Sequence, residues 1–146
     1  MPVTLAPAPA AAAPIQPFTV TVLVNVAMDN GRFANFDGYQ EGRPVAEVST
    51  TAGQVLRMRF TAVDEQAAAE AAFSVGNRQS RDDLGQTWPH DVRSVSVGDV
   101  LRVEDDHGRA IHLAVLGVGF DKVDPPRNTV PLQGSPATSR GAAPRS

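Results

Sequence analysis

Three histidines and several neighbouring carboxylates are the residue types here that hydrolytic or metal chemistry would use. The histidines are His90, His107 and His112. Asp105, Asp106 and His107 are consecutive, an arrangement that resembles part of a metal site, but Gly108 follows them directly. Asp and Gly are favoured in hairpin turns for backbone reasons, and the tip of such a turn is solvated. We therefore interpret the segment as a turn and expect no metal ion there.

No set of residues in the sequence forms a recognisable catalytic motif. The chain has no cysteine, which excludes disulfides, thiolate metal sites and a cysteine nucleophile. Ser94 and Ser96 lack the Gly-x-Ser-x-Gly context of a nucleophile elbow, and no glycine-rich loop leads into a helix. We interpret the Asp82-Asp83 pair and residues 104–106 as solvated loop charges. His112 alternates with apolar neighbours, which predicts the less buried face of a strand. We expect neither enzyme activity nor a cofactor.

Aromatic and arginine side chains alternate in one segment that could recognise a partner. Phe33, Phe36 and Tyr39 lie between Arg32 and Arg43. Aromatic rings interleaved with arginine can stack on single-stranded nucleic acid, and the same residues suit a protein partner. The alternative is that the rings fold back into a core that has few other aromatics. The residues we predict for recognition are Arg32, Phe36, Tyr39 and Arg43.

The charge distribution argues against a large phosphate-binding face. The chain has 13 basic and 16 acidic residues, and three of the basic ones follow Pro125: Arg127, Arg140 and Arg145. The segment 18–125 therefore holds 10 basic and all 16 acidic residues, a net charge of −6. An acidic surface of this kind usually confers solubility. Mimicry of DNA charge is a further explanation of the acidic balance, and strong salt dependence of a complex would indicate it.

Composition divides the chain into a central domain and two terminal segments. Residues 1–17 contain five prolines and no charged side chain, which predicts a disordered arm; an early start codon is the alternative explanation. Residues 126–146 predict a similar disordered tail. We expect one folded domain over 18–125. No apolar run is long enough to cross a membrane, residues 1–17 lack the basic start of a signal peptide, and the absence of cysteine fits the cytoplasm.

Alternating apolar residues predict a small antiparallel sheet of about five strands with one helix. The clearest strand is 18–26, where Phe18 and every second residue after it are apolar. Further strands are expected at 45–50, 54–62, 100–104 and 110–116, with a short one in 118–123. The alanine-rich segment 64–74 predicts the helix, with Asp64 as its N-cap and Gly76-Asn77 as its end. Strands in succession with a single helix predict an α+β fold with the helix on one face.

The closing half of the domain resembles the YodL-like family. The residues that carry the resemblance are Ser94-Val95-Ser96-Val97-Gly98-Asp99-Val100, continuing to Val103, and Leu116-Gly117-Val118-Gly119-Phe120-Asp121-Lys122-Val123. The similarity covers about residues 73–123 and is loose before that. YodL-like domains occur in small uncharacterised proteins of bacterial mobile elements, and the resemblance implies that context without implying a reaction. The Val97–Val100 turn is also similar to turns of RNA-binding barrels of the PUA and ASCH type.

From these observations we expect a non-enzymatic accessory protein of a bacterial mobile element that acts as a protein-interaction module. An RNA- or DNA-binding β domain is the alternative. A positive groove beside Phe36 and Tyr39 would favour nucleic acid, whereas a negative surface there would favour a protein partner. The sequence leaves the oligomeric state open.

Overall fold

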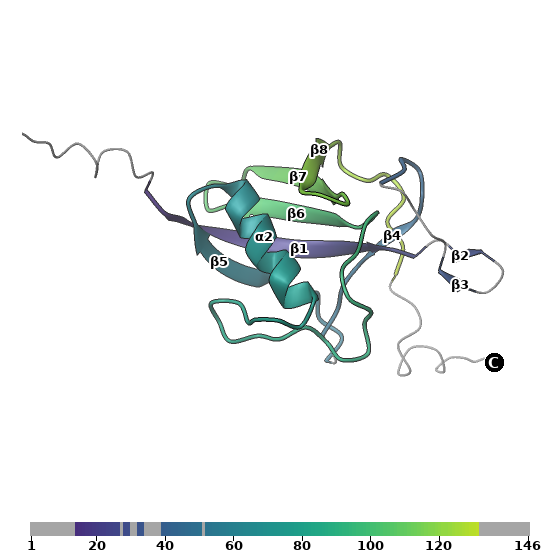
Figure 1. The fold of residues 1–146 in the computed structure, drawn as a ribbon, viewed down its shortest axis with the longest axis horizontal. Coiled ribbons are helices and arrows are strands. Elements are labelled where there is room, and N and C mark those ends of the chain that lie inside the picture. The colour runs from purple at the N-terminus through teal and green to yellow at the C-terminus, as the bar shows by residue number, and fades with distance from the viewer. Residues whose placement is uncertain (1–13, 27, 30–31, 34–38, 51, 132–146) are drawn as a thin grey trace, which may run out of the picture.

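The computed structural model describes residues 14–26, 28–29, 32–33, 39–50 and 52–131. It shows one six-stranded antiparallel sheet with a single helix lying across one face (Figure 1). The strands of this sheet are β1 (Gln16–Asn25), β4 (Val45–Glu47), β5 (Met58–Ala62), β6 (Val100–Asp105), β7 (Ala110–Val115) and β8 (Phe120–Val123). A separate two-stranded sheet pairs β2 (Met28–Asp29) with β3 (Arg32–Phe33). The α+β prediction is confirmed.

The long strand β1 is the centre of the sheet. One edge of β1 pairs with β6, in a register that sets Val20 opposite Val103. Its other edge pairs with β5 at the start, where Phe18 faces Phe60, and with β4 at the end, where Leu23 faces Glu47. The sheet then continues from β6 to β7 and β8. A run of alternating β-branched residues forms β1 because such side chains pack well on a pleated surface.

The helix α2 (Glu65–Gly76) begins where the sequence predicts and continues two residues further than expected. The Asp64 carboxylate accepts a hydrogen bond of 2.8 Å from the Ala67 amide, which satisfies one of the free N–H groups of the first turn. The predicted end at Gly76-Asn77 is confirmed, with Gly76 as the last helical residue and Asn77 as the C-cap. A Cβ at Gly76 would lie 2.3 Å from Val95 Cγ2, so the glycine permits close packing. The left-handed residue after the helix is Arg78, with φ of 64°.

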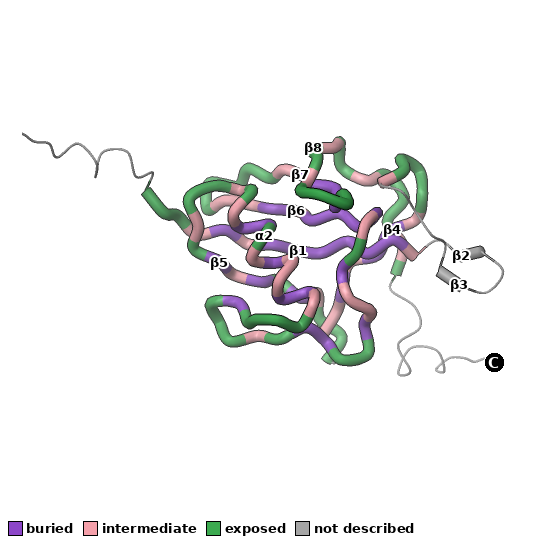
Figure 2. The backbone as a smooth tube through the Cα atoms, in the orientation of Figure 1, coloured by how far each residue is buried: buried purple, intermediate pink, exposed green. Residues whose placement is uncertain are grey.

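Buried residues run along the inner strands of the sheet (Figure 2), and the two faces of the sheet differ in what they bury. The face under α2 carries the main apolar core. Its residues come from β1, β5, β6 and β7, from the connection between β4 and β5, from the helix and from the segment after it: Phe18, Val20, Val22, Val24, Val48, Leu56, Met58, Phe60, Ala68, Ala69, Ala72, Val75, Trp88, Val92, Val95, Leu101, Val103, Leu113 and Val115. The opposite face holds a small cluster of Leu23, Val45, Val100 and Ala114, with Tyr39 and Val123 packed against it.

Pairing extends past both predicted domain boundaries. Strand β1 starts at Gln16, two residues before the expected start. Beyond the expected end at 125, the Val45 amide donates to the Asn128 carbonyl at 2.9 Å, and the Val130 amide donates to the Val45 carbonyl at 2.8 Å. The segment 128–130 therefore runs along the outer edge of β4. The rest of the two predicted tails, 1–13 and 132–146, lies outside the described residues. No helix in the described ranges is long and apolar enough to span a membrane.

Candidate functional site

Strand β8 forms one border of the sheet. It pairs with β7 in a register that sets Phe120 opposite Val115 and Val123 opposite His112. Among the strands that the structure describes, β7 is its only neighbour. One side of the β8 backbone therefore presents unpaired N–H and C=O groups, and such an edge is a template for pairing with another chain.

The turn between β7 and β8 exposes two apolar side chains beside this edge. The Leu116 amide donates to the Gly119 carbonyl at 3.1 Å, and Gly119 takes the left-handed conformation with φ of 75°. Leu116 is 36% exposed and Val118 is 92% exposed. A four-residue turn leaves no room for either side chain to reach the core. The apolar surface therefore stands next to the first residue of β8.

A hollow of about 540 Å³ lies at the other end of β8. Tyr39, Glu41, Lys122, Val123 and Asp124 line it. Burial raises the pKa of the Tyr39 hydroxyl, and the nearby Glu41 carboxylate raises it further. The hydroxyl is therefore a hydrogen-bond donor and acceptor across the physiological range. Apolar surface at one end of β8 and a polar hollow at the other define what we call the β8 edge site.

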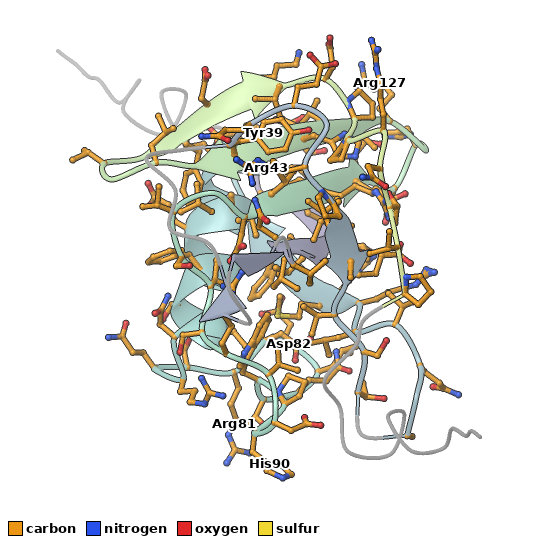
Figure 3. The ribbon with its side chains drawn as sticks, turned by 90° about the vertical axis from the view of Figure 1, so that its right-hand side faces the viewer. Tyr39, Arg43, Arg81, Asp82, His90 and Arg127 are labelled. Carbon is orange, nitrogen blue, oxygen red and sulfur yellow. The ribbon has the colours of Figure 1, made fainter. Side chains whose placement is uncertain are left out.

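The hollow is of mixed charge. Glu41 and Asp124 supply carboxylates, Lys122 supplies an ammonium group, and Arg127 Nε approaches Glu41 Oε2 at 3.3 Å. Figure 3 shows Tyr39 and Arg127 at the same end of the molecule. The lining is not the positive groove that would favour nucleic acid at Tyr39.

The structure brings one of the four predicted recognition residues to this site. Tyr39 lines the hollow and is half-buried against the small cluster on the open face, so it both packs and borders a surface. Arg43 is exposed and its Nε donates to Gln40 Oε1 at 3.1 Å; it does not line the hollow. The side chain of Arg32 and the whole of Phe36 lie outside the described residues.

The predicted hairpin between the strands β6 and β7 is confirmed. Asp105 is not a solvated loop charge as predicted, because it is the last residue of β6 and its side chain is 5% exposed. Asp105 Oδ1 accepts from the amides of His107 and Arg109 at 2.8 and 3.0 Å, and these bonds hold the pKa of Asp105 below its usual value. In the described part of the chain, no group of three or more potential ligands is placed to hold a metal ion. His112 is predicted on the less buried face of its strand, but it is buried, on the face opposite α2 that also carries Ala114.

The interpretation of Asp82 as a solvated charge is wrong. Asp82 is 5% exposed and accepts four hydrogen bonds, from the amides of Arg59, Leu84 and Gln86 and from the Gln86 side chain. A carboxylate with this many donors remains buried because the bonds replace its hydration. Its neighbour Asp83 is exposed and accepts from the Thr61 hydroxyl at 2.9 Å.

Asp99 is a second buried carboxylate, and it ties the segment after α2 to the sheet. It is fully buried and accepts from the Asn25 amide at 2.8 Å and from the Ser96 amide at 2.9 Å. Arg93 contacts both of its oxygens, at 2.8 and 2.9 Å. The sequence indicates the local bond from Ser96. The bonds from Asn25, 74 residues away, and from Arg93, six residues away, could be found only from the fold.

Comparison with known proteins finds no matching family model, no matching curated protein and no matching solved structure. The YodL-like resemblance therefore remains a prediction from the sequence, and the function has to be argued from the geometry alone.

Proposed function

We propose that this protein is a non-catalytic accessory module that binds an extended segment of a partner protein as an additional strand on β8. The observation that carries the proposal is the β8 edge site itself. Among the described strands, β8 has an unpaired side and lies between exposed apolar residues and a lined hollow. Strand addition supplies affinity through main-chain hydrogen bonds and specificity through side-chain contacts. The mobile-element context is the one that the sequence resemblance implies.

The chemistry of the site sets what the partner segment should carry. Near Phe120 it meets Leu116 and Val118, so an apolar residue is favoured there. Near Val123 it meets the Tyr39 hydroxyl and the Asp124 carboxylate, so a hydrogen-bonding residue is favoured at that end. The partner is therefore an extended segment that is apolar at one end and polar at the other.

A second copy of this chain fits the edge poorly in the two antiparallel registers that are centred on its charged residues. Antiparallel strands set residues that face the same side of the sheet directly opposite each other. Pairing centred on residue 121 would oppose two Asp121 side chains, and pairing centred on residue 122 would oppose two Lys122 side chains. Like charges directly opposite each other destabilise a pair. These charges favour a different chain as the added strand.

Peptides selected from a displayed random library provide the test. We expect enriched peptides to shift the backbone amide resonances of residues 120–123. They should bind at least about tenfold more weakly to the double variant Leu116→Ser, Val118→Ser. A tenfold loss of affinity corresponds to about 1.4 kcal/mol of lost apolar contact. The matched control is Leu84→Ser, which removes a 68% exposed leucine far from β8 in sequence and should leave binding unchanged.

Three results would overturn the proposal. The first is that no peptide is enriched. The second is that binding is the same in the double variant and leaves the amides of 120–123 unshifted. The third is that a single-stranded oligonucleotide, and no peptide, shifts the ring resonances of Tyr39, the single tyrosine of the chain. That last result would support the nucleic-acid alternative.

A further inference from the structure

A second hollow, of about 450 Å³, lies in the segment that follows α2. Its lining comes from two stretches of that segment: Arg78, Gln79, Ser80, Arg81, Thr87, Trp88 and His90. Figure 3 shows Arg81 and His90 at the end of the molecule opposite Tyr39 and Arg127. This loop hollow is therefore separate from the β8 edge site.

The lining of the loop hollow contains cationic and neutral polar groups and no carboxylate. Two arginines and a histidine line it, in a chain whose formal net charge is −3. The adjacent Asp82 carboxylate is buried and does not line the hollow, and its oxygens already accept hydrogen bonds from the amides of Arg59, Leu84 and Gln86. Asp91, next to His90 in sequence, does not line the hollow.

One wall of the loop hollow is fixed in place by hydrogen bonds. The Arg78 guanidinium donates to the Ser94 hydroxyl at 2.7 Å and to the Val92 carbonyl at 2.5 Å, with longer bonds to the carbonyls of Pro89 and His90. The Trp88 Nε1–H donates to the carbonyls of Val92 and Arg93. These acceptors are all neutral, so the positive charge of Arg78 is not cancelled by an ion pair within the described chain.

Other donors at the hollow are unoccupied. Within the ranges that the structure describes, the Arg81 guanidinium and the His90 ring have no hydrogen-bond or ion-pair partner, and both residues are exposed. The same holds for the side chains of Gln79 and Thr87. Guanidinium groups present a planar fork of donors that matches the oxygens of phosphate, and hydrogen bonds to such an ionised group are stronger than neutral ones.

We propose that the loop hollow binds a phosphate monoester. A tetrahedral phosphate presents three oxygens in different directions, and donors stand on different parts of the lining: Arg81 on the first stretch, Thr87 and His90 on the second. A volume of about 450 Å³ accommodates the phosphate and the group that carries it. The proposal is independent of strand addition at β8, since the two sites share no residue.

Trp88 is the single tryptophan of the chain and lines the loop hollow, so its emission reports binding there. We would titrate the full chain with O-phosphoserine, inorganic phosphate and succinate at matched ionic strength. The expected result is a saturable emission change with O-phosphoserine and a weaker or absent one with succinate. Comparison of O-phosphoserine with inorganic phosphate shows whether an ester or free phosphate is preferred.

The variant Arg81→Gln should weaken O-phosphoserine binding about tenfold, because it removes a charge-assisted bond from the phosphate. Its matched control is Arg57→Gln, another exposed arginine whose side chain has no partner in the described ranges and does not line the hollow. This control should bind like the original chain. Circular dichroism of both variants checks that each is folded.

The proposal is overturned by any of four results. They are an emission that does not saturate, succinate binding as tightly as O-phosphoserine, equal affinity in Arg81→Gln and the original chain, and equal weakening in Arg57→Gln. The last would indicate a general response to net charge. None of these results bears on peptide binding at β8, so failure here leaves the proposed function standing.

Discussion

The outer edges of β5 and β8 are two borders of the same sheet, and they differ in whether another segment covers them. The outer edge of β5 is closed by the segment after α2: Asp82 Oδ2 accepts from the Arg59 amide at 2.9 Å, and the Asp83 amide donates to the Arg59 carbonyl at 2.8 Å. Gln86 Nε2 also donates to the Arg57 carbonyl at 2.9 Å. The outer edge of β8 has no such cover among the described residues. The buried Asp82 carboxylate and the Gln86 side-chain amide therefore bond to backbone groups along this edge, where a seventh strand would otherwise pair.

This difference indicates where a partner can add. An uncovered edge attracts other strands, and proteins usually blunt it with charges, bulges or a covering segment. The outer edge of β4 is covered in part by residues 128–130. Among the described residues, β8 is therefore the border without a covering segment. Asp121 and Lys122 then disfavour the self-pairing registers centred on either residue, while they leave the backbone free for a different chain.

Removal of the Asp82 carboxylate should break the closed edge. We expect Asp82→Ala to lower the free energy of unfolding by about 3 kcal/mol, because four donors lose their acceptor and several stay buried. Urea denaturation measures the loss, and hydrogen exchange should show the Arg59 amide losing protection first. The control Asp83→Ala removes an exposed acceptor and should cost less than about 1 kcal/mol. Equal losses in both variants would mean that Asp82 does not close the edge.

Gly76 tests whether close packing between α2 and the segment after it contributes to stability. In Gly76→Ala the new Cβ would meet Val95 Cγ2 at 2.3 Å, so Val95 must shift. Overpacking costs about 1–3 kcal/mol, and the better helix propensity of Ala offsets up to about 1 kcal/mol of that. We expect a net destabilisation of about 1 kcal/mol in thermal unfolding. Gly117→Ala adds a Cβ with no atom within 4 Å and should be neutral; a neutral Gly76→Ala would show that Val95 adapts freely.

His112 lies on β7 directly opposite Val123 of β8, so it reports on the open face beside the uncovered edge. Burial lowers its pKa from the ordinary 6.5, and the Arg102 guanidinium lowers it further, while Glu104 opposes them. The unfolded chain therefore takes up this proton first as pH falls. The contribution of His112 to stability should fall as pH drops below about 6.5 and reach its minimum below the folded pKa.

Thermal unfolding at a series of pH values compares the original chain with His112→Gln. The variant should lack the part of the pH dependence that begins near the ordinary histidine pKa, while the dependence caused by carboxylates stays. Because Nε2 of His112 accepts from Arg102 Nε at 3.4 Å, protonation also removes an acceptor. Identical pH profiles for the two proteins would show that His112 is as hydrated in the folded state as in the unfolded one.

The elements that are specified by a local sequence pattern were predictable from the sequence. The period of two in β1 and the alanines after Asp64 gave the central strand and the helix to within about two residues, because side-chain alternation and capping are local properties. Strands β4 and β5 are shorter than predicted. Residues 48–50 and 52–57 instead belong to a connection in which Thr50 and Gln54 bond to each other and Ser49 bridges to Val55.

The site was less predictable, because it depends on contacts between distant residues. Tyr39 was found through its aromatic neighbours in sequence. Asp82 and Asp99 were missed as buried groups, since the amides of Arg59 and Asn25 that make burial favourable are 23 and 74 residues away. The exposure of Val118 was also missed, since a valine between two glycines has no pattern that tells a turn tip from a core position.

The smallest expected effect completes the comparison of the two edges. Val118→Ser should change the free energy of unfolding by less than about 0.5 kcal/mol, because a side chain that is 92% exposed loses almost no packing. Val95, in the segment after α2, is the matched buried valine, with 2% of it exposed. Val95→Ser should lower the free energy of unfolding by about 2 kcal/mol or more. If Val118→Ser proved as destabilising as Val95→Ser, the turn before β8 would be part of the core, and the edge beside it would not be free to accept a strand.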